Sequence, residues 1–307
     1  MRLRSFDWVL VLVLCTAAFG TFAFAQDAGT MQVVVTEEAK KGASLPDLRA
    51  TDLVVNVDKD RGRATALAPI RPGGAGLELM VVVDDGLDPA VANQFSEITR
   101  FMQSLPQSAY VGVGYLRNGG ITVAQQPTND HAQAAKALRI PTGDPGINPS
   151  PYTAIGDFVK AWQRSPQRAR EIVLISDGVD WLYGGGPANP YVDSAINEAQ
   201  RASVVIYSIY AQGALHRGRG SFQTTWGQNN LGILSDATGG EMYGFGMGAP
   251  VSFAPHLSDI SDHLKHQYLL TFTPPASKSG FKSINVQAEG RNSDLVTQKR
   301  VYIEGGK

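Results

Sequence analysis

Three oxygen-bearing side chains stand at the ends of predicted secondary-structure elements. Asp84 follows an apolar run over residues 77–83, Asp177 follows a second run over residues 171–176, and Thr153 opens the helix before that second run. In an open parallel sheet, the carboxyl ends of the strands meet at one edge, where ligands bind. We therefore expect these side chains to share a crevice. Carboxylate and hydroxyl oxygens are the ligands that hard divalent cations prefer.

The elements that must position these side chains alternate between strand and helix. The apolar run 77–83 is typical of a strand buried on both faces, and Asp88 followed by Pro89 favours a helix start. The alternation continues through a helix over 191–201 and a strand over 204–211. It predicts an α/β fold: a doubly wound, mostly parallel sheet with helices on both faces.

Sequence patterns typical of β-strands occur on both sides of this region. The flanking strands are predicted at residues 31–36, 52–57, 268–273, 283–288 and 295–304. We expect them to meet in a small β region, because the chain ends of a domain often lie close together. The predicted organisation is a signal peptide over 1–25, an N-terminal β flank over 26–76, an α/β domain over 77–266 and a C-terminal β flank over 267–307.

The order of these motifs resembles the von Willebrand factor A (VWA) family. The resemblance rests on the loop after the first strand, the distant Thr153, the Ser176-Asp177-Gly178 strand end, and the Thr238-Gly239-Gly240 turn. The flanks 48–53 and 267–275 are similar to those of exported VWA-related proteins of the acidobacterial type. The resemblance implies a VWA/Rossmann-like fold and a protein-binding, adhesion-type function.

The resemblance also implies a metal-ion-dependent adhesion site, but in a degenerate form. Asp84, Thr153 and Asp177 match the family's ligands, whereas Gly86 and Asp88 stand in place of its two serines. With Asp88 as a fourth ligand, the site would hold one divalent cation, Mg²⁺, Mn²⁺ or Ca²⁺. The alternative is an inert edge, in which Asp88 and Thr153 only cap helices and Asp177 only begins a turn.

Loops around the same edge carry a predicted partner-binding rim. Its residues are Asp85, Asp180, Trp181 and Tyr183, next to the Gly-rich stretch 184–187. Exposed aromatic side chains are enriched at binding hot spots. The alternative is a rim that packs on its own domain.

Two other motifs favour structural interpretations. The basic stretch 216–220 is short and fits a solvated loop, so we do not expect nucleic-acid contact. His256, His263 and His266 flank the buried stripe of one predicted helix and are expected at its surface, not in a zinc site.

The start of the chain is typical of a secretory signal peptide. Arg2 and Arg4 precede an apolar run over 9–24 that ends in Ala23-Phe24-Ala25, too short for a spanning helix of about 18 residues. We expect export to the periplasm or outside a bacterial cell, with no membrane span after cleavage. The sole cysteine, Cys15, lies within this segment. Cleavage leaves 25 basic and 27 acidic residues, a balance that argues against nucleic acid as the partner.

The sequence predicts a binding protein and not an enzyme. No Gly-x-Ser-x-Gly or His-Glu-x-x-His motif occurs, and no His is placed by sequence to activate Ser176. The alternatives are a metal-independent structural component of an envelope assembly and a metal-assisted hydrolase that uses Asp84, Asp88 and Asp177. The identity of the protein partner does not follow from the sequence.

Overall fold

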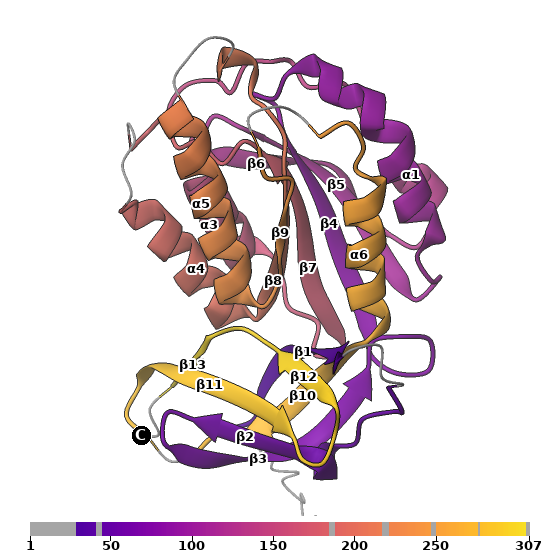
Figure 1. The fold of residues 1–307 in the computed structure, drawn as a ribbon, viewed down its shortest axis with the longest axis vertical. Coiled ribbons are helices and arrows are strands. Elements are labelled where there is room, and N and C mark those ends of the chain that lie inside the picture. The colour runs from indigo at the N-terminus through magenta and orange to yellow at the C-terminus, as the bar shows by residue number, and fades with distance from the viewer. Residues whose placement is uncertain are drawn as a thin grey trace, which may run out of the picture.

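A computed structural model describes residues 29–40, 45–183, 188–216, 221–246, 250–275 and 277–304. The predicted signal peptide, residues 1–25 with Cys15, lies outside the described residues, as do 184–187 and 217–220. The described chain forms two sheets, a larger α/β unit and a smaller β unit below it (Figure 1). Within these residues no helix is long and apolar enough to cross a membrane.

The α/β unit is built on a six-stranded sheet with the order β6-β5-β4-β7-β8-β9. Its strands are β4 (Gly76–Asp84), β5 (Ala109–Arg117), β6 (Gly120–Thr128), β7 (Arg168–Ser176), β8 (Val204–Tyr210) and β9 (Met242–Tyr243). All neighbours are parallel except β6, which pairs antiparallel with β5. Counted within the unit, this is the 3-2-1-4-5-6 order of a doubly wound sheet, which confirms the predicted fold class.

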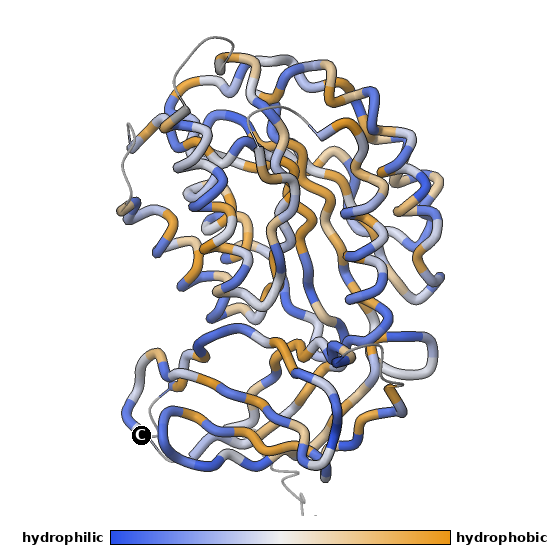
Figure 2. The backbone as a smooth tube through the Cα atoms, in the orientation of Figure 1, coloured by the Kyte–Doolittle hydropathy of each residue, from blue (hydrophilic) through white to orange (hydrophobic). Residues whose placement is uncertain are grey.

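Helices cover both faces of this sheet. One face carries α1 (Phe95–Ser104), α2 (His131–Ala135) and α6 (Ala254–Lys265), and the other carries α3 (Pro151–Ala161), α4 (Pro190–Ala202) and α5 (Ser221–Thr238). Leu79 and Val81 of β4 pack into the first layer, whereas Met80 and Val82 pack into the second. The continuous apolar run therefore arises because both faces of β4 are buried, and Figure 2 shows hydrophobic residues along the central strands.

Two helix starts differ from prediction. Asp88 caps a 3₁₀ segment, η3 (Pro89–Gln94), through a bond from the Ala90 amide, and α1 begins only after it. The helix assigned to Thr153 begins at Pro151 with Ser150 as its N-cap, because proline is favoured at the first helical position.

The small β unit contains seven strands in the order β12-β1-β10-β3-β2-β11-β13. Its elements are β1 (Met31–Ala39), β2 (Leu53–Val57), β3 (Asp60–Pro69), β10 (Gln267–Thr273), β11 (Gly280–Ala288), β12 (Ser293–Val296) and β13 (Arg300–Ile303). Short 3₁₀ segments occur at η2 (Ala50–Asp52) and, in the α/β unit, at η4 (Ala214–His216).

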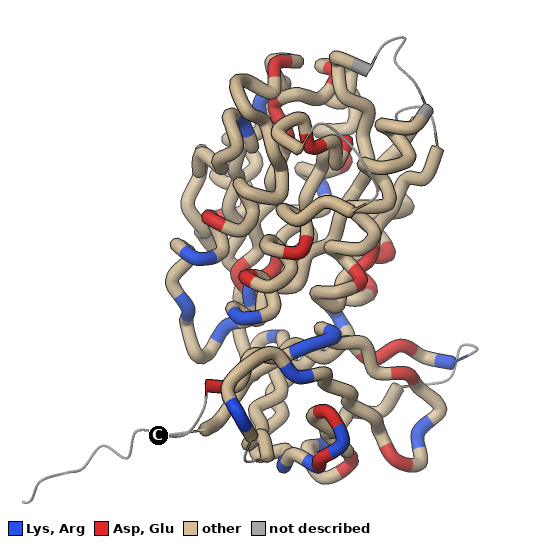
Figure 3. Tube along the Cα trace, turned by 90° about the vertical axis from the view of Figure 1, so that its left-hand side faces the viewer, with Lys and Arg blue, Asp and Glu red and all other residues tan. Residues whose placement is uncertain are grey.

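In this unit the N-terminal strands meet the C-terminal ones, as expected. Met31 is opposite Phe272, and Val57 is opposite Ile284. The predicted strand over 295–304 is instead two strands, separated by residues 297–299, of which Gln298 donates to the Gln200 carbonyl of the α/β unit. Figure 3 shows both acidic and basic residues along the described chain of this unit.

Candidate functional site

Asp84 and Asp177 meet in a crevice at the carboxyl edge of the sheet. Asp84 ends β4, and Asp177 follows β7, its parallel neighbour, in which Ile175 is opposite Val83. The order of the strands reverses between β4 and β7, which is where open α/β sheets bind ligands. The crevice has a volume of about 10 Å³, room for one water-sized sphere.

Three carboxylate oxygens in the crevice already accept hydrogen bonds from backbone amides or from one serine. Oδ1 of Asp84 accepts from the Gly86 amide at 2.9 Å, and Oδ2 accepts from Ser176 Oγ at 2.7 Å. Oδ1 of Asp177 accepts from the Val179 amide at 2.9 Å. The backbone at Gly213 passes so close that a Cβ there would lie 2.1 Å from Asp177 Oδ2. The two carboxylates are thus held by the protein itself.

The pKa values of both carboxyl groups are raised well above their ordinary range. Burial, and then the charge of Asp177, raise the pKa of Asp84 to about 7. Burial likewise raises the pKa of Asp177 to about 7. Two like charges in a buried crevice are costly, so the pair takes up a proton near neutral pH.

The hydroxyl of Thr153 does not join the pair. Its Oγ1 donates to the Ser150 carbonyl at 3.2 Å, inside the first turn of α3, and Thr153 does not line the crevice. The hydroxyl that reaches Asp84 is that of Ser176. Its position as the last residue of an apolar run, directly before Asp177, is the sequence signal that could have found it.

Asp88 also lies outside the crevice. Its Oδ1 accepts from the Ala90 amide at 3.0 Å as a helix cap, and Asp88 does not line the crevice. At Gly86, a Cβ would lie 2.8 Å from Cβ of Pro145, so a serine there would require the Pro145 loop to move. Neither position supplies the neutral oxygen that the resemblance implies.

These residues do not fit the divalent cation of an adhesion site. Of the four predicted ligands, only Asp84 and Asp177 line the crevice, whereas Mg²⁺ requires about six oxygens in octahedral geometry. In the part of the chain that the structure describes, no group of three or more His, Cys, Asp or Glu is arranged to hold a metal ion.

Asp85 of the predicted rim is a buried anchor for a loop. Its side chain accepts from both terminal nitrogens of Arg139, at 2.7 and 2.9 Å, and from the Thr142 amide at 3.0 Å. Partial burial opposes ionisation, but Arg139 and Thr142 outweigh it and lower the pKa of Asp85. Asp85 thereby fixes the loop between α2 and α3 over the crevice.

Asp180 has the same kind of role in the loop after β7. Oδ2 accepts from Ser150 Oγ at 2.8 Å and from Asn189 Nδ2 at 2.9 Å, while Oδ1 accepts from the Leu182 and Tyr183 amides. Asp180 is buried, so it positions the loop and does not itself face solvent. Trp181, half-buried, lines the crevice, and Tyr183 is exposed.

The exposed apolar side chains gather at this same edge. Among the described residues, the large hydrophobic side chains that are well exposed are Ile140, Ile147, Leu182, Tyr183, Leu215, Phe222, Ile233, Phe245 and Val251. Two of them lie in α5, Phe222 in its first turn and Ile233 farther along it, and the other seven lie in the loop above β4 and β5, or between the carboxyl end of β7, β8 or β9 and the following helix. Figure 1 shows these loops together at the end of the sheet away from the β unit. We call the eight residues other than Ile233 the apolar rim.

No protein-family model matches the chain, and no curated protein matches it. Among solved structures, it is similar to BatB from Bacteroides thetaiotaomicron (15% identity, TM-score 0.44, 62% of this chain and 97% of that chain). It is also similar to a von Willebrand factor type A protein from Catenulispora acidiphila (10%, 0.44, 90% and 73%). A third is the vWF domain of the pilus tip protein Mfa5 from Porphyromonas gingivalis (11%, 0.43, 61% and 94%).

At these identities and TM-scores, the function of this chain has to be argued from its own residues. The strand order and the two helix layers establish the doubly wound sheet independently. The larger unit of this protein has the doubly wound α/β fold that the sequence predicted.

Proposed function

We propose that this protein is exported and binds another protein through the carboxyl edge of its parallel sheet, without a metal ion as a ligand bridge. The observation that carries the proposal is the apolar rim: of the nine exposed large hydrophobic side chains among the described residues, eight occupy one end of the molecule. Clustered exposed apolar residues are typical of protein interaction sites, whereas scattered single ones need no explanation.

Two of the loops that carry the rim are anchored, which favours binding of a partner by a preformed surface. Asp85 fixes the loop that carries Ile140 and Ile147, and Asp180 fixes the loop that carries Leu182 and Tyr183. An ordered loop loses little conformational entropy on binding. We infer that the partner presents apolar or aromatic side chains to the rim.

The crevice under the rim supports a metal-independent mode. A metal bridge needs open coordination positions for the partner's carboxylate, and the donors of such a site are not assembled around Asp84 and Asp177. Export rests on the sequence of residues 1–25, and the absence of enzymatic activity stays a prediction.

The test is cross-linking with a matched apolar control. A photoreactive amino acid at position 215 or 245 of the mature protein is expected to capture one partner from envelope extract, in the presence of EDTA. The same group at position 233, exposed and apolar but far from the start of α5, should not capture it.

Charged substitutions give the second arm of this test. Leu215→Asp and Phe222→Asp should abolish capture, and Ile233→Asp should leave it intact. Capture that needs Mg²⁺ would contradict the metal-independent mode. Equal capture from all positions, or capture only through the β unit, would instead support a structural component of an envelope assembly.

A further inference from the structure

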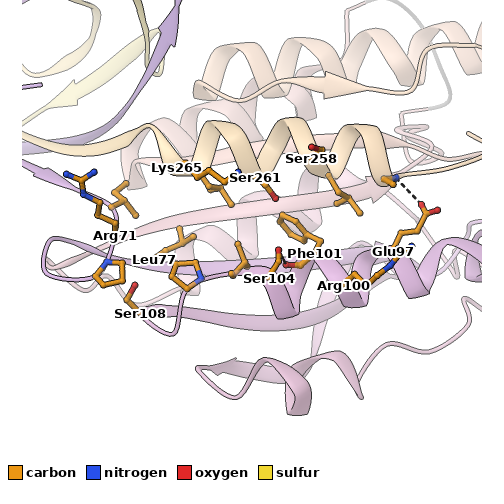
Figure 4. A pocket seen from close by; sticks show the side chains of 17 residues that line it. Arg71, Leu77, Glu97, Arg100, Phe101, Ser104, Ser108, Ser258, Ser261 and Lys265 are labelled. Carbon is orange, nitrogen blue, oxygen red and sulfur yellow. Dashed lines mark hydrogen bonds between the residues drawn. The ribbon is translucent and has the colours of Figure 1, made fainter. Parts of the chain in front are cut away.

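A second, larger hollow lies on the side of the α/β unit, between α1 and α6. Its volume is about 760 Å³, within the range of roughly 300 to 1,000 Å³ that ligand sites occupy. Its floor is apolar, with Leu77, Phe101 and Leu257 among the lining side chains. Figure 4 shows it as a groove that runs along the two helices.

Small side chains keep this groove open. Leu257, Ile260 and Leu264 form the stripe by which α6 packs on the sheet. Ser258 and Ser261, which lie beside that stripe, line the groove together with Ser104 of α1. Because serines fill little volume, the space between the helices remains unfilled above an apolar floor.

Three cationic side chains line the groove. Arg71 and Lys265 lie at one end, and Arg100 lies at the other (Figure 4). Glu97 is the only acidic residue in the lining. Its carboxylate already accepts from Ser252 Oγ and from the amides of Phe253 and Ala254, so it serves to hold the start of α6.

Arg71 and Lys265, at one end of the groove, can exchange their present ion-pair partners for a bound anion. Arg71 pairs with Asp47 at 2.9 Å and Lys265 with Asp262 at 2.7 Å, and all four side chains are about half exposed or more. Exposed ion pairs contribute little to stability. Either cation can therefore turn to a bound anion at small cost.

We propose that this groove binds a single-chain carboxylate of the fatty-acid class. Its carboxylate lies between Arg71 and Lys265, and its alkyl chain runs along the floor past Leu77 and Phe101 toward Ala254. Charge complementarity selects the anionic head, and the apolar floor selects the chain. This binding is separate from the apolar rim and does not depend on the partner proposed above.

The test is calorimetric titration of the mature protein with dodecanoate below its micelle concentration. We expect one site per chain, and at least a tenfold weaker affinity in the double variant Arg71→Gln, Lys265→Gln. Lys136→Gln, an exposed cation outside the groove, should bind as the wild type does. Dodecyltrimethylammonium, with the same chain and the opposite charge, should not bind.

A variant that fills the groove tests the location. Ser261→Leu should abolish binding, whereas Ser261→Ala, which keeps the space, should preserve it; thermal unfolding of both variants checks that they fold. Absence of dodecanoate binding to the wild type would overturn the proposal. Equal binding of both surfactant charges, or full binding by Ser261→Leu, would overturn it as well.

Discussion

Ser176 Oγ donates a 2.7 Å hydrogen bond to Asp84 Oδ2 and thereby links the ends of β7 and β4. Both residues are buried, at 0% and 5% exposure, so water does not easily replace this donor. The same hydroxyl oxygen accepts from the Gly178 amide at 3.0 Å, which fixes the turn after β7. The Ser176 side chain therefore fixes both the carboxyl group of Asp84 and the backbone turn after β7, at the point where the strand order of the sheet reverses.

Removal of this hydroxyl should destabilise the fold. Ser176→Ala leaves a buried carboxyl oxygen and a buried amide without a partner, which costs about 1–3 kcal/mol for such a group. Urea unfolding at neutral pH measures the loss. Ser235→Ala, which breaks a buried bond between two neutral serines, Ser235 and Ser208, is the matched control and should cost less. An equal loss in both variants would contradict the special role of Ser176.

The space at Gly86 gives a prediction about the missing serine of the adhesion site. Gly86→Ser should destabilise the protein by about 1–3 kcal/mol, because the new Cβ meets Pro145 in a packed loop. Gly86→Ala should cost about the same, since the clash comes from Cβ and not from the hydroxyl. Stabilisation by Gly86→Ser alone would show that the hydroxyl finds a ligand role after all.

Divalent cations should leave the mature protein unchanged. Titration with Mg²⁺, Mn²⁺ or Ca²⁺ is expected to give no saturable heat and no shift in Tm, because a ligand that binds the folded state would raise Tm. Asp177→Asn provides the comparison. A saturable signal in the wild type that disappears in Asp177→Asn would restore the metal-dependent adhesion site.

The sequence identified the sheet better than the site. Strands buried on both faces, such as β4, have a continuous apolar pattern, and parallel neighbours must end at one edge, so the pairing of Asp84 with Asp177 could be predicted. β3 was missed because its side chains are largely exposed or half-buried and follow no apolar pattern. The direction of a hydroxyl depends on local bonding, so the sequence did not show that Thr153 turns to Ser150.

The burial of Asp85 and Asp180 could not be predicted from the sequence. Asp85 and Asp180 were predicted at a partner-binding rim, because they lie in loops around the carboxyl edge of the sheet. Some of their partners, Arg139 for Asp85 and Ser150 for Asp180, come from other loops, and the sequence does not reveal which loops meet. The exposed hydrophobic residues near them carry the binding proposal instead.

Glu171 should make stability depend on pH. It is fully buried in β7, and neither carboxyl oxygen has a hydrogen-bond partner among the described residues. Burial raises its pKa from 4.5 to about 8. The folded state then binds more protons than the unfolded state, so this contribution is full below pH 4.5 and is lost as pH rises toward 8.

The free energy of unfolding should therefore fall as pH rises between these values, with a flatter slope in Glu171→Gln. Asp84 and Asp177, with pKa values raised to about 7, contribute in the same direction over a lower range. Urea unfolding at a series of pH values measures the slopes. An identical slope in Glu171→Gln would show that Glu171 titrates normally in the folded protein.

The Asp85–Arg139 pair allows the anchoring of the apolar rim to be tested. Arg139→Ala removes two of the hydrogen bonds to the buried Asp85 and should cost about 1–3 kcal/mol. Because Ile140 and Ile147 lie in the loop that this pair holds, hydrogen exchange at the Thr142 amide should become faster and partner capture weaker. Arg117→Ala breaks an exposed ion pair with Asp144 of the same loop and should change stability by less than about 1 kcal/mol. If Arg139→Ala loosens the loop but leaves capture intact, the binding surface lies on the other loops of the rim.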